Sequence, residues 1–359
     1  MIYLFLLIML VVFEMLERVF INKRITLGKN EIASIIGKFN RVFFFVCLVL
    51  ITSFRHISIG KDTIAYYERL NIYRHMELMK AISYYNTYEY GSIVLGWLCS
   101  RVSFGFRLYI FLMSLIYFYA VFLVYGRYSK SFWLSIVFFI GLGFFTSSFT
   151  IVDQTFALAF SMLAFYNYHK NNLFLSLVFF MLAISFHLSA IVLIFSLISK
   201  AKFKSMYLFL FMGFSVATLT YKANLYYFLS VFVKSNFTET EMGGKLFFIF
   251  LFAVFIFCIY YHKKSRHNNS SNAFLWMIAI CFAIYPISLF HPALSRLIYY
   301  YLIFMPILLV NTIIGLKGIF KSLFFTMFSL SVLYHAISNV FTISKRILPY
   351  RFMDFFGRF

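Results

Sequence analysis

The sequence predicts an all-α polytopic membrane protein, and three observations lead to this fold class. Of the 359 residues, 63% are hydrophobic and 23% are aromatic, whereas only 12% are charged. Soluble globular chains carry about a quarter charged residues, so this chain is expected to have lipid as its solvent. The apolar residues also gather in long runs that short basic clusters separate. We therefore expect a single integral membrane domain over residues 1–359.

The apolar runs predict the membrane-spanning helices in order along the chain. A helix needs about 20 residues to cross the hydrocarbon core. The runs lie at about 2–18, 42–54, 106–126, 131–148, 154–168, 173–198, 206–220, 246–261, 273–290, 297–313 and 321–341. Several of them are short, which favours broken or re-entrant segments, and together they predict about 11 or 12 crossings.

Two segments have lengths that do not fit a simple crossing. The run 173–199 is long for one helix and carries His187 near its middle. It is expected to form either one long helix or two half-helices that meet at this histidine. The segment 91–104 is too short for a comfortable crossing, so a re-entrant or interfacial helix is expected there.

Clusters of Lys and Arg predict the cytoplasmic side, because cytoplasmic loops carry an excess of these residues. The clearest inside loops are SKAKFKS (199–205) and HKKSRHNNSSN (262–272). The other segments assigned to this side are 19–41, 127–130, 169–172 and 314–321. The outer face then carries two long loops, 55–105 and 221–245. We expect the second loop to be ordered or partly helical, because its first half is amphipathic enough to lie at the membrane interface.

Charge and motifs exclude several function classes. The net charge of +21 could suit nucleic acid, but the basic residues lie in short clusters between apolar runs and not on one face. The four cysteines lie in or beside apolar segments without CxxC spacing, so neither disulfides nor a metal site are expected. No P-loop, GxGxxG, HExxH or GxSxG motif stands in a supporting context, and no cofactor is expected.

Five ionisable residues from separate parts of the chain are expected at or near the outer face. They are Arg55, Asp62, Asp153, His187 and Arg296. An ionisable residue at membrane depth is costly and usually lines a cavity or pathway. Their common side therefore predicts one functional site, and the alternative is that outer loops simply collect polar residues.

The stretch RHISIGKDTIAYY, residues 55–67, combines an anion-binding group with a proton acceptor. Gly60 permits a tight turn, which brings Arg55 and Asp62 to one helix start. As an alternative, Arg55 extends to the lipid headgroups, and Asp62 pairs with it or caps the helix TIAYYERL.

His187 and Arg296 could complete such a site. His187 can accept a proton near neutral pH, although a lone histidine in an apolar helix is as often a packing residue. Arg296 would add a second guanidinium, and guanidinium groups bind phosphate oxygens through two parallel hydrogen bonds. Two arginines at the outer face therefore suggest a polyprenyl pyrophosphate ligand. Asp153 and Gln154 are weaker candidates, because Asp153 also fits a cap of the following helix.

The stretch RHISIGKDTIAY resembles the Arg-x(4)-Gly-x-Asp-x(3)-Tyr signature of the EpsG family of bacterial polysaccharide polymerases. The matching residues are Arg55, Gly60, Asp62 and Tyr66. Looser elements of the family follow in the expected order. They are Glu89 with Gly91, His187 with Ser189, Arg296 with Tyr299, and Pro349 with Tyr350. The chain departs from the family at Asp153-Gln154, where members commonly show Arg-Gln, and it thereby lacks a positive charge at position 153.

The resemblance implies a Wzy-type polymerase of O-antigen or capsule repeat units, similar to other multi-spanning glycosyltransferases that use lipid-linked sugar donors. It would transfer a growing glycan from undecaprenyl pyrophosphate to a lipid-linked repeat unit at the outer face of a bacterial cytoplasmic membrane. Asp62 and His187 would be catalytic. The implied substrate-binding residues are Arg55, Gly60, Tyr66, Glu89, Gln154, Arg296 and Tyr299. A chain-length regulator and a flippase are the implied partners.

Two other function classes remain open at this point. A polysaccharide flippase would also be polytopic and basic, but flippases usually carry charges within their spans and show two related halves. A membrane acyltransferase of surface sugars would need a histidine near an early span with access to a cytosolic acyl donor. The nearly uncharged spans and the late position of His187 favour the polymerase.

Overall fold

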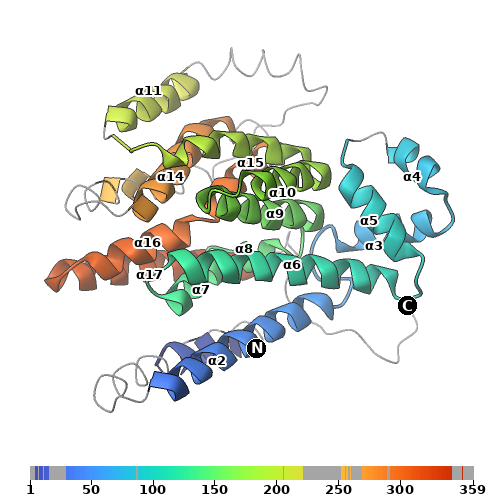
Figure 1. Cartoon of the computed structure of the whole chain (residues 1–359), viewed down its shortest axis with the longest axis horizontal. Helices are drawn as coiled ribbons and strands as arrows, with labels where there is room; N and C mark the ends of the chain where they lie inside the picture. Colours follow the sequence, from blue (N-terminus) through green and yellow to red (C-terminus); the bar gives the residue numbers. More distant parts are fainter. Residues whose placement is uncertain are drawn as a thin grey trace.

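The computed structural model of the chain is helical throughout. It describes residues 5–6, 8–10, 12–15, 30–85, 88–204, 206–220, 252–254, 256–257, 259, 269–288, 292–341 and 350. Every regular element among these residues is a helix, which agrees with the predicted all-α class. Figure 1 shows long helices side by side in a bundle, with shorter helices at one end of it.

Three long helices from the first half of the chain pack in a row. They are α2 (Asn30–Ser53), α6 (Gly105–Tyr128) and α9 (Val152–His169). α6 packs against both α2 and α9, and it buries aromatic side chains such as Tyr117 and Phe118. With 24 residues, α6 is about 36 Å long, which is enough to cross a hydrocarbon core of about 30 Å.

The predicted run 131–148 is broken into two helices. α7 (Phe132–Gly141) ends before Gly143, which has a φ of 82°. This left-handed conformation suits glycine because it has no Cβ. The short helix α8 (Phe144–Ser147) follows. The break allows the chain to turn and to present the backbone at Phe149 near the end of the bundle.

The apolar run around His187 forms a helical hairpin. α10 (Leu173–Phe186) leads to His187, and η1 (Leu188–Lys200), a 3-10 helix, leads back. His187 has an extended backbone, with φ −156° and ψ 118°. At the far end of η1, Lys200 Nζ donates to Asn171 Oδ1 at 2.8 Å, beside the start of α10. Of the two predicted arrangements, the two half-helices that meet at the histidine are confirmed.

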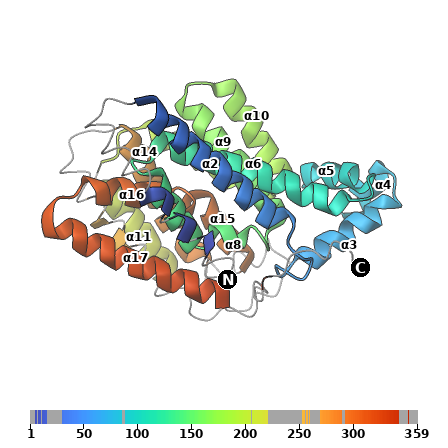
Figure 2. The ribbon, with the colours of Figure 1, turned by 90° about the horizontal axis from the view of Figure 1, so that it is seen from below.

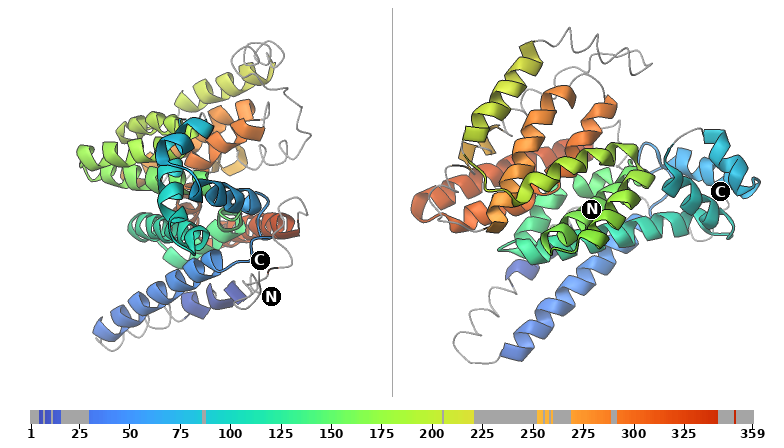
Figure 3. Two further views of the ribbon diagram at one scale, coloured as in Figure 1. Left: turned by 90° about the vertical axis from the view of Figure 1, so that its right-hand side faces the viewer. Right: turned by 45° about the horizontal axis from the view of Figure 1, so that its top comes forward.

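Helices from the second half of the chain cover one side of this core. They are α11 (Met206–Thr220), α14 (Asn269–Ser288), α15 (Pro292–Leu302), α16 (Met305–Gly315) and α17 (Gly318–Phe341). α14 packs against α11, α15 and η1. Figure 3 shows α11, in yellow, on the opposite side of the bundle from α2, in blue.

Three short helices, which we call the α3–α5 lobe, lie at one end of the bundle (Figures 1 and 2). They are α3 (Thr63–Arg74), α4 (Leu78–Tyr85) and α5 (Tyr90–Ser100). α5 contacts α3, α4, α6 and α10. Its 11 residues give a length of about 16 Å, which is too short to cross a membrane. This agrees with the prediction that 91–104 does not cross.

Segments predicted to lie on the cytoplasmic side meet at the other end of the bundle, as far as the structure describes them. The backbone N–H of Lys130 donates to Asn311 Oδ1 at 2.7 Å. His169 Nε2 lies 2.9 Å from Ser199 Oγ. The bundle therefore has two distinct ends, and the assignment of one of them to the cytoplasm stays a prediction.

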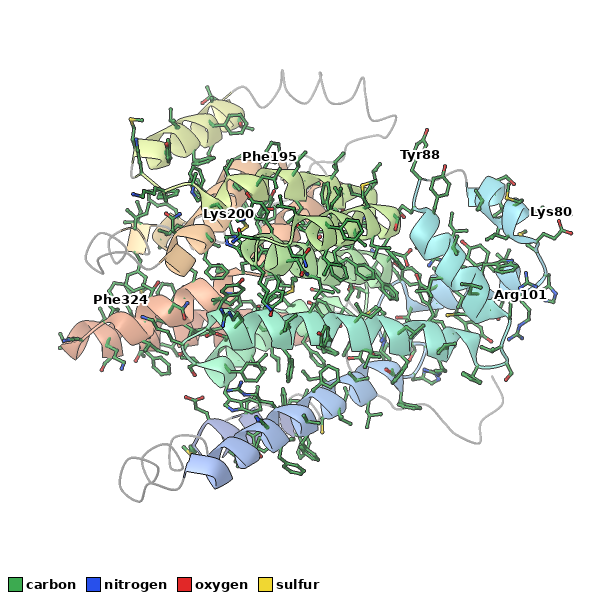
Figure 4. The ribbon with its side chains drawn as sticks, viewed as in Figure 1. Lys80, Tyr88, Arg101, Phe195, Lys200 and Phe324 are labelled. Atoms are coloured by element: carbon green, nitrogen blue, oxygen red, sulfur yellow. The ribbon has the colours of Figure 1, made fainter. Side chains whose placement is uncertain are left out.

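The described helices fit a membrane protein. Two of them, Gly105–Tyr128 and the combined Arg296–Gly315, are long and apolar enough to cross a membrane, and five shorter apolar helices accompany them. α10 and η1 also expose large apolar side chains, such as Phe174 in α10 and Phe195 in η1 (Figure 4), and exposed apolar surface of this kind marks membrane or protein contact. The number of 11 or 12 crossings stays a prediction, and the predicted loop 221–245 lies outside the described residues.

Candidate functional site

The motif of residues 55–67 holds one backbone carbonyl of a distant segment. Arg55 is 1% exposed. Its Nη1 donates to the Thr52 carbonyl at 2.6 Å, and its Nη2 donates to the Phe149 carbonyl at 3.2 Å. The Thr63 hydroxyl, at the start of α3, lies 3.0 Å from the same Phe149 oxygen. Arg55 therefore acts within the protein in this structure, and the interpretation that it extends to lipid headgroups is wrong.

Gly60 makes this close approach possible. It has a φ of 93°, a conformation that costs a residue with a Cβ about 1–3 kcal/mol. A Cβ at this position would also lie 2.2 Å from the Phe149 oxygen and 2.6 Å from Thr63 Oγ1. The predicted tight turn is thus present, and glycine is required there for two separate reasons.

We expect Gly60→Ala to destabilise the protein, because the turn and the Phe149 contact cannot both persist. The unfolding temperature in detergent and the amount of protein in the membrane should both fall. Gly37→Ala is the matched control, since a Cβ there meets nothing within 4 Å and alanine favours the helix. Equal stability of the two variants would show that the turn can relax at no cost.

Asp62 precedes α3 as a half-buried residue. It occupies the N-cap position, but its side chain makes no capping hydrogen bond. It also forms no ion pair with Arg55, because the described ion pairs are Arg69–Asp153 and His187–Glu89. Asp62 is therefore the N-cap residue of α3 by position, whereas the predicted pairing with Arg55 is wrong, and its carboxylate remains available at the start of the helix.

Asp153 belongs to a buried ion pair with Arg69 of α3. Arg69 Nη1 donates to Oδ2 at 2.7 Å and Nη2 to Oδ1 at 3.0 Å, and the Tyr109 hydroxyl donates to Oδ1 at 2.6 Å. Burial opposes the charge on Arg69, but the Asp153 carboxylate raises the pKa of this guanidinium well above its usual range. Ile151 is the N-cap of α9, so the idea that Asp153 caps this helix is wrong.

Tyr66, the last residue of the Arg-x(4)-Gly-x-Asp-x(3)-Tyr signature, packs against this ion pair. Its ring centroid lies 4.8 Å from Arg69 Cζ, which is a cation–π distance. Burial, with a further contribution from the Asp153 charge, raises the pKa of Tyr66 well above its usual range. The hydroxyl therefore stays protonated at neutral pH and can donate a hydrogen bond.

Gln154 connects this region to Arg296. Its Nε2 donates to the Arg296 carbonyl at 2.8 Å, whereas its Oε1 is buried without a hydrogen-bond partner. The half-buried Arg296 side chain makes no hydrogen bond or ion pair with the residues that the structure describes. The segment at the start of α9 is therefore bound to the backbone of α15 at Arg296, and the Arg296 guanidinium and the Gln154 amide oxygen are both available there.

Glu89 and His187 form a hydrogen-bonded pair in the site. His187 Nδ1 is hydrogen-bonded to Glu89 Oε1, which also accepts from the Leu188 backbone N–H at 3.3 Å. A carboxylate can only accept, so the neutral form of the imidazole carries its proton on Nδ1 and its lone pair on Nε2. Nε2 is buried and has no hydrogen-bond partner. His187 can therefore accept a proton at Nε2, and Glu89 sets its tautomer.

Gly91 allows α5 to approach the end of α10 closely enough for this pair. A Cβ at Gly91 would lie 2.5 Å from Ser185 Oγ and 2.9 Å from the Phe186 ring. The glutamate and the glycine of this predicted element thus have separate tasks. Glu89 binds His187, and Gly91 leaves room for the end of α10 to pack closely against α5.

Tyr300 of α15 links the histidine to Arg296. Its hydroxyl lies 3.0 Å from Ser189 Oγ, two residues after His187. Glu89 and Arg296 both lie within electrostatic range of the same hydroxyl. The His187 hairpin and the Arg296 helix therefore face one another.

The predicted residues thus lie in one region at the end of the bundle that carries the α3–α5 lobe. The segment 149–154 joins them, since it contacts both Arg55 and Arg296. Tyr299 lies at the edge of this region, where its ring packs against Phe144 with centroids 6.1 Å apart.

Tyr350 is the described residue of the predicted closing element. Its hydroxyl donates to the carbonyl of Ile51, and its ring lies 6.4 Å from that of Phe149. Tyr350 therefore lies beside Ile51 and Phe149, next to the 55–67 motif. This contact ties the last predicted element to the first.

Three residues of the region carry little signal in the sequence. Arg69 lies one turn after Tyr66 and so shares its helix face, which could have singled it out. Tyr109 and Tyr300 do not stand out among 27 tyrosines. The described residues contain no group of three or more His, Cys, Asp or Glu that could hold a metal ion.

The arrangement offers a positioned proton acceptor, an available guanidinium and neutral hydrogen-bond donors. Such a set can remove a proton from a hydroxyl and stabilise a negative charge that develops nearby. No curated protein and no solved structure matches the chain. The EpsG family matches residues 38–352, a range that includes every residue of the site. The chain therefore belongs to the EpsG family.

Proposed function

We propose that the protein is a Wzy-type polymerase of surface polysaccharide repeat units, acting at the outer face of a bacterial cytoplasmic membrane. Membership of the EpsG family and the apolar helical architecture support a polysaccharide polymerase in a membrane. The proposed donor is a growing glycan on undecaprenyl pyrophosphate, and the acceptor is a lipid-linked repeat unit.

The reaction needs one proton transfer and one leaving group. A hydroxyl of the acceptor sugar attacks the anomeric carbon of the donor glycan. The bond from that carbon to the pyrophosphate oxygen breaks, and the pyrophosphate leaves on its lipid with the electron pair. The hydroxyl proton passes to a general base, which typically contributes about 10²–10⁴-fold to the rate.

The observation that carries the proposal is the Glu89–His187 pair. The Nδ1 hydrogen bond to Glu89 orients the imidazole, and the buried Nε2 without a partner is suited to take the acceptor proton. Asp62, the other catalytic candidate from the sequence, lies at the start of α3 and makes no described contact with His187. We therefore assign the base to His187 in this proposal.

Arg296 is the proposed pyrophosphate ligand. Its side chain has no partner among the described residues, and it lies near the same tyrosine hydroxyl as Glu89. Leaving pyrophosphate gains negative charge, which a guanidinium stabilises through two parallel hydrogen bonds. Arg55 has a different task in this scheme, because it already donates to two carbonyls and so shapes the loop.

The glycan of a deletion strain tests the function. We expect cells that carry only single repeat units where the wild type carries a ladder of chains, and the full gene should restore the ladder. Lipid-linked repeat units held on the cytoplasmic side would instead indicate a flippase. Unchanged ladders would contradict both functions.

Arg296→Ala is expected to reduce polymerisation about tenfold or more, because a charge-assisted hydrogen bond contributes about 1.5–3 kcal/mol. Arg296→Lys should retain part of the activity, since a point charge replaces the two-pronged group. The measurement is glycan chain length on a gel, with the protein level in the membrane measured in parallel.

Arg127→Ala is the matched control for Arg296. Arg127 is an exposed arginine in the last turn of α6, at the opposite end of the bundle from the site. Its replacement should leave the ladder unchanged. A normal ladder from Arg296→Ala would remove this arginine from the site.

A further inference from the structure

Arg107, in the first turn of α6, is a half-buried cation without a described counter-charge. Its Nη1 donates to the carbonyls of Arg55 and Ser53 at 2.5 and 3.5 Å. Its Nε and Nη2 are buried and have no hydrogen-bond partner. The described ion pairs, Arg69–Asp153 and His187–Glu89, do not include it. Arginine stays charged in proteins, so Arg107 retains its charge with two donors unused.

The two unused donors lie on the same edge of the guanidinium. Nε–H and Nη2–H point in parallel from that edge, and they match the spacing of two oxygens on a phosphate or carboxylate group. A buried charge is costly unless it is paired and hydrogen-bonded. The residues that the structure describes provide this pairing for Arg69 but not for Arg107. An anion with two oxygens would complete it.

The surroundings favour a phosphate at the membrane surface. Arg107 is the third residue of α6, so it lies only about 3 Å along the axis from the start of that helix, and α6 is long and apolar enough to cross a membrane. Its Nη1 bond to the Arg55 carbonyl joins it to the 55–67 motif. The hydroxyls of Tyr67 and Tyr350 lie within electrostatic range of its guanidinium, and phenols are also phosphate donors.

We propose that Arg107 binds a phosphate group through Nε and Nη2, as a second cation of the site beside the 55–67 motif. The expectation that this phosphate is part of a polyprenyl diphosphate rests on the function proposed above. A phospholipid headgroup offers the same oxygens, and the experiment separates the two sources. Because both nitrogens are hidden from solvent, a neighbouring side chain has to move when the phosphate enters.

The test uses the purified full-length protein in detergent. Farnesyl diphosphate is the probe, farnesol is the matched compound without phosphate, and phosphatidylglycerol that stays bound is measured by native mass spectrometry. We expect Arg107→Gln to weaken farnesyl diphosphate binding about tenfold or more, the loss typical of a charge-assisted contact, and to leave farnesol binding unchanged. Arg107→Lys should fall between the wild type and Arg107→Gln, because it keeps the charge and loses the parallel donors.

Lys61→Gln is the control for a general effect of charge, since Lys61 is an exposed lysine of the 55–67 motif. It should bind farnesyl diphosphate as the wild type does. Loss of retained phosphatidylglycerol from Arg107→Gln, with diphosphate binding unchanged, would support the phosphate site and assign it to a membrane lipid. Unchanged binding of both ligands would overturn the proposal.

Two further features of the experiment allow the proposal to be tested even if one variant or the polymerase function fails. If Arg107→Gln does not fold, the comparison rests on Arg107→Lys, which keeps the charge and both carbonyl contacts within reach. Diphosphate binding is measured without polymerisation, so a failed polymerase function in the deletion strain would leave this result intact. Conversely, normal binding of both the diphosphate and phosphatidylglycerol by both variants would reject Arg107 and leave the polymerase function untouched.

Discussion

Replacing His187 with asparagine is expected to lower polymerisation by about 10²–10⁴-fold, the usual contribution of a general base. The asparagine amide can still donate to Glu89 from nearly the position of Nδ1, so the turn between α10 and η1 should survive. What disappears is Nε2, the buried acceptor without a partner. The measurement is glycan chain length in a deletion strain that carries the variant, together with the protein level in the membrane.

Glu89 variants separate positioning from proton transfer. Glu89→Gln can donate to the imidazole and so reverse its tautomer, which places the proton on Nε2 and should abolish most activity. Glu89→Asp keeps the carboxylate and should restore part of it. Full activity of His187→Asn would exclude His187 as the base, and Asp62→Asn would then be the next variant to measure.

Asp153→Ala is expected to destabilise the protein by about 3–5 kcal/mol, because removal of one partner leaves a buried charge unpaired. The affected charge is Arg69, whose side chain is 14% exposed and which donates twice to Asp153. The Tyr109 hydroxyl also loses its acceptor. The unfolding temperature in detergent and the yield of folded protein should both fall.

The double variant Asp153→Leu with Arg69→Met tests the cause. Replacement of a buried ion pair by apolar residues of similar size is often neutral for stability, so the double variant should recover most of what Asp153→Ala loses. A double variant no more stable than the single one would show that the loss arises elsewhere, for example at the Tyr109 hydroxyl.

The membrane class and several breaks in the helices could be predicted from the sequence. Composition alone indicates lipid as the solvent, because 12% charged residues cannot cover a soluble surface of this chain length. The break at His187 is one of the two arrangements that a run too long for one crossing allows. The short α5 follows from a segment that is too short for one. These inferences depend on length and hydrophobicity, which are local properties of a sequence.

The contacts of the site could not be predicted in the same way. Arg69 meets Asp153 and Glu89 meets His187 across many intervening residues, and neither pair has a spacing that a sequence reveals. Arg55 donates to backbone carbonyls. Because every residue carries a backbone carbonyl, the sequence does not show which residues accept from Arg55. The resemblance to the EpsG family identified the histidine and the glutamate separately, and only the fold brings them together.

Because η1 is a 3-10 helix, it is longer than an α-helix with the same number of residues would be. A 3-10 helix rises about 2.0 Å per residue and an α-helix about 1.5 Å. The 13 residues of η1 therefore extend about 26 Å, close to the length of about 27 Å of the 18-residue α9 beside it. Wound as an α-helix, the same residues would be about 6 Å shorter. With Lys200 held at Asn171, Ser189 would then no longer reach Tyr300.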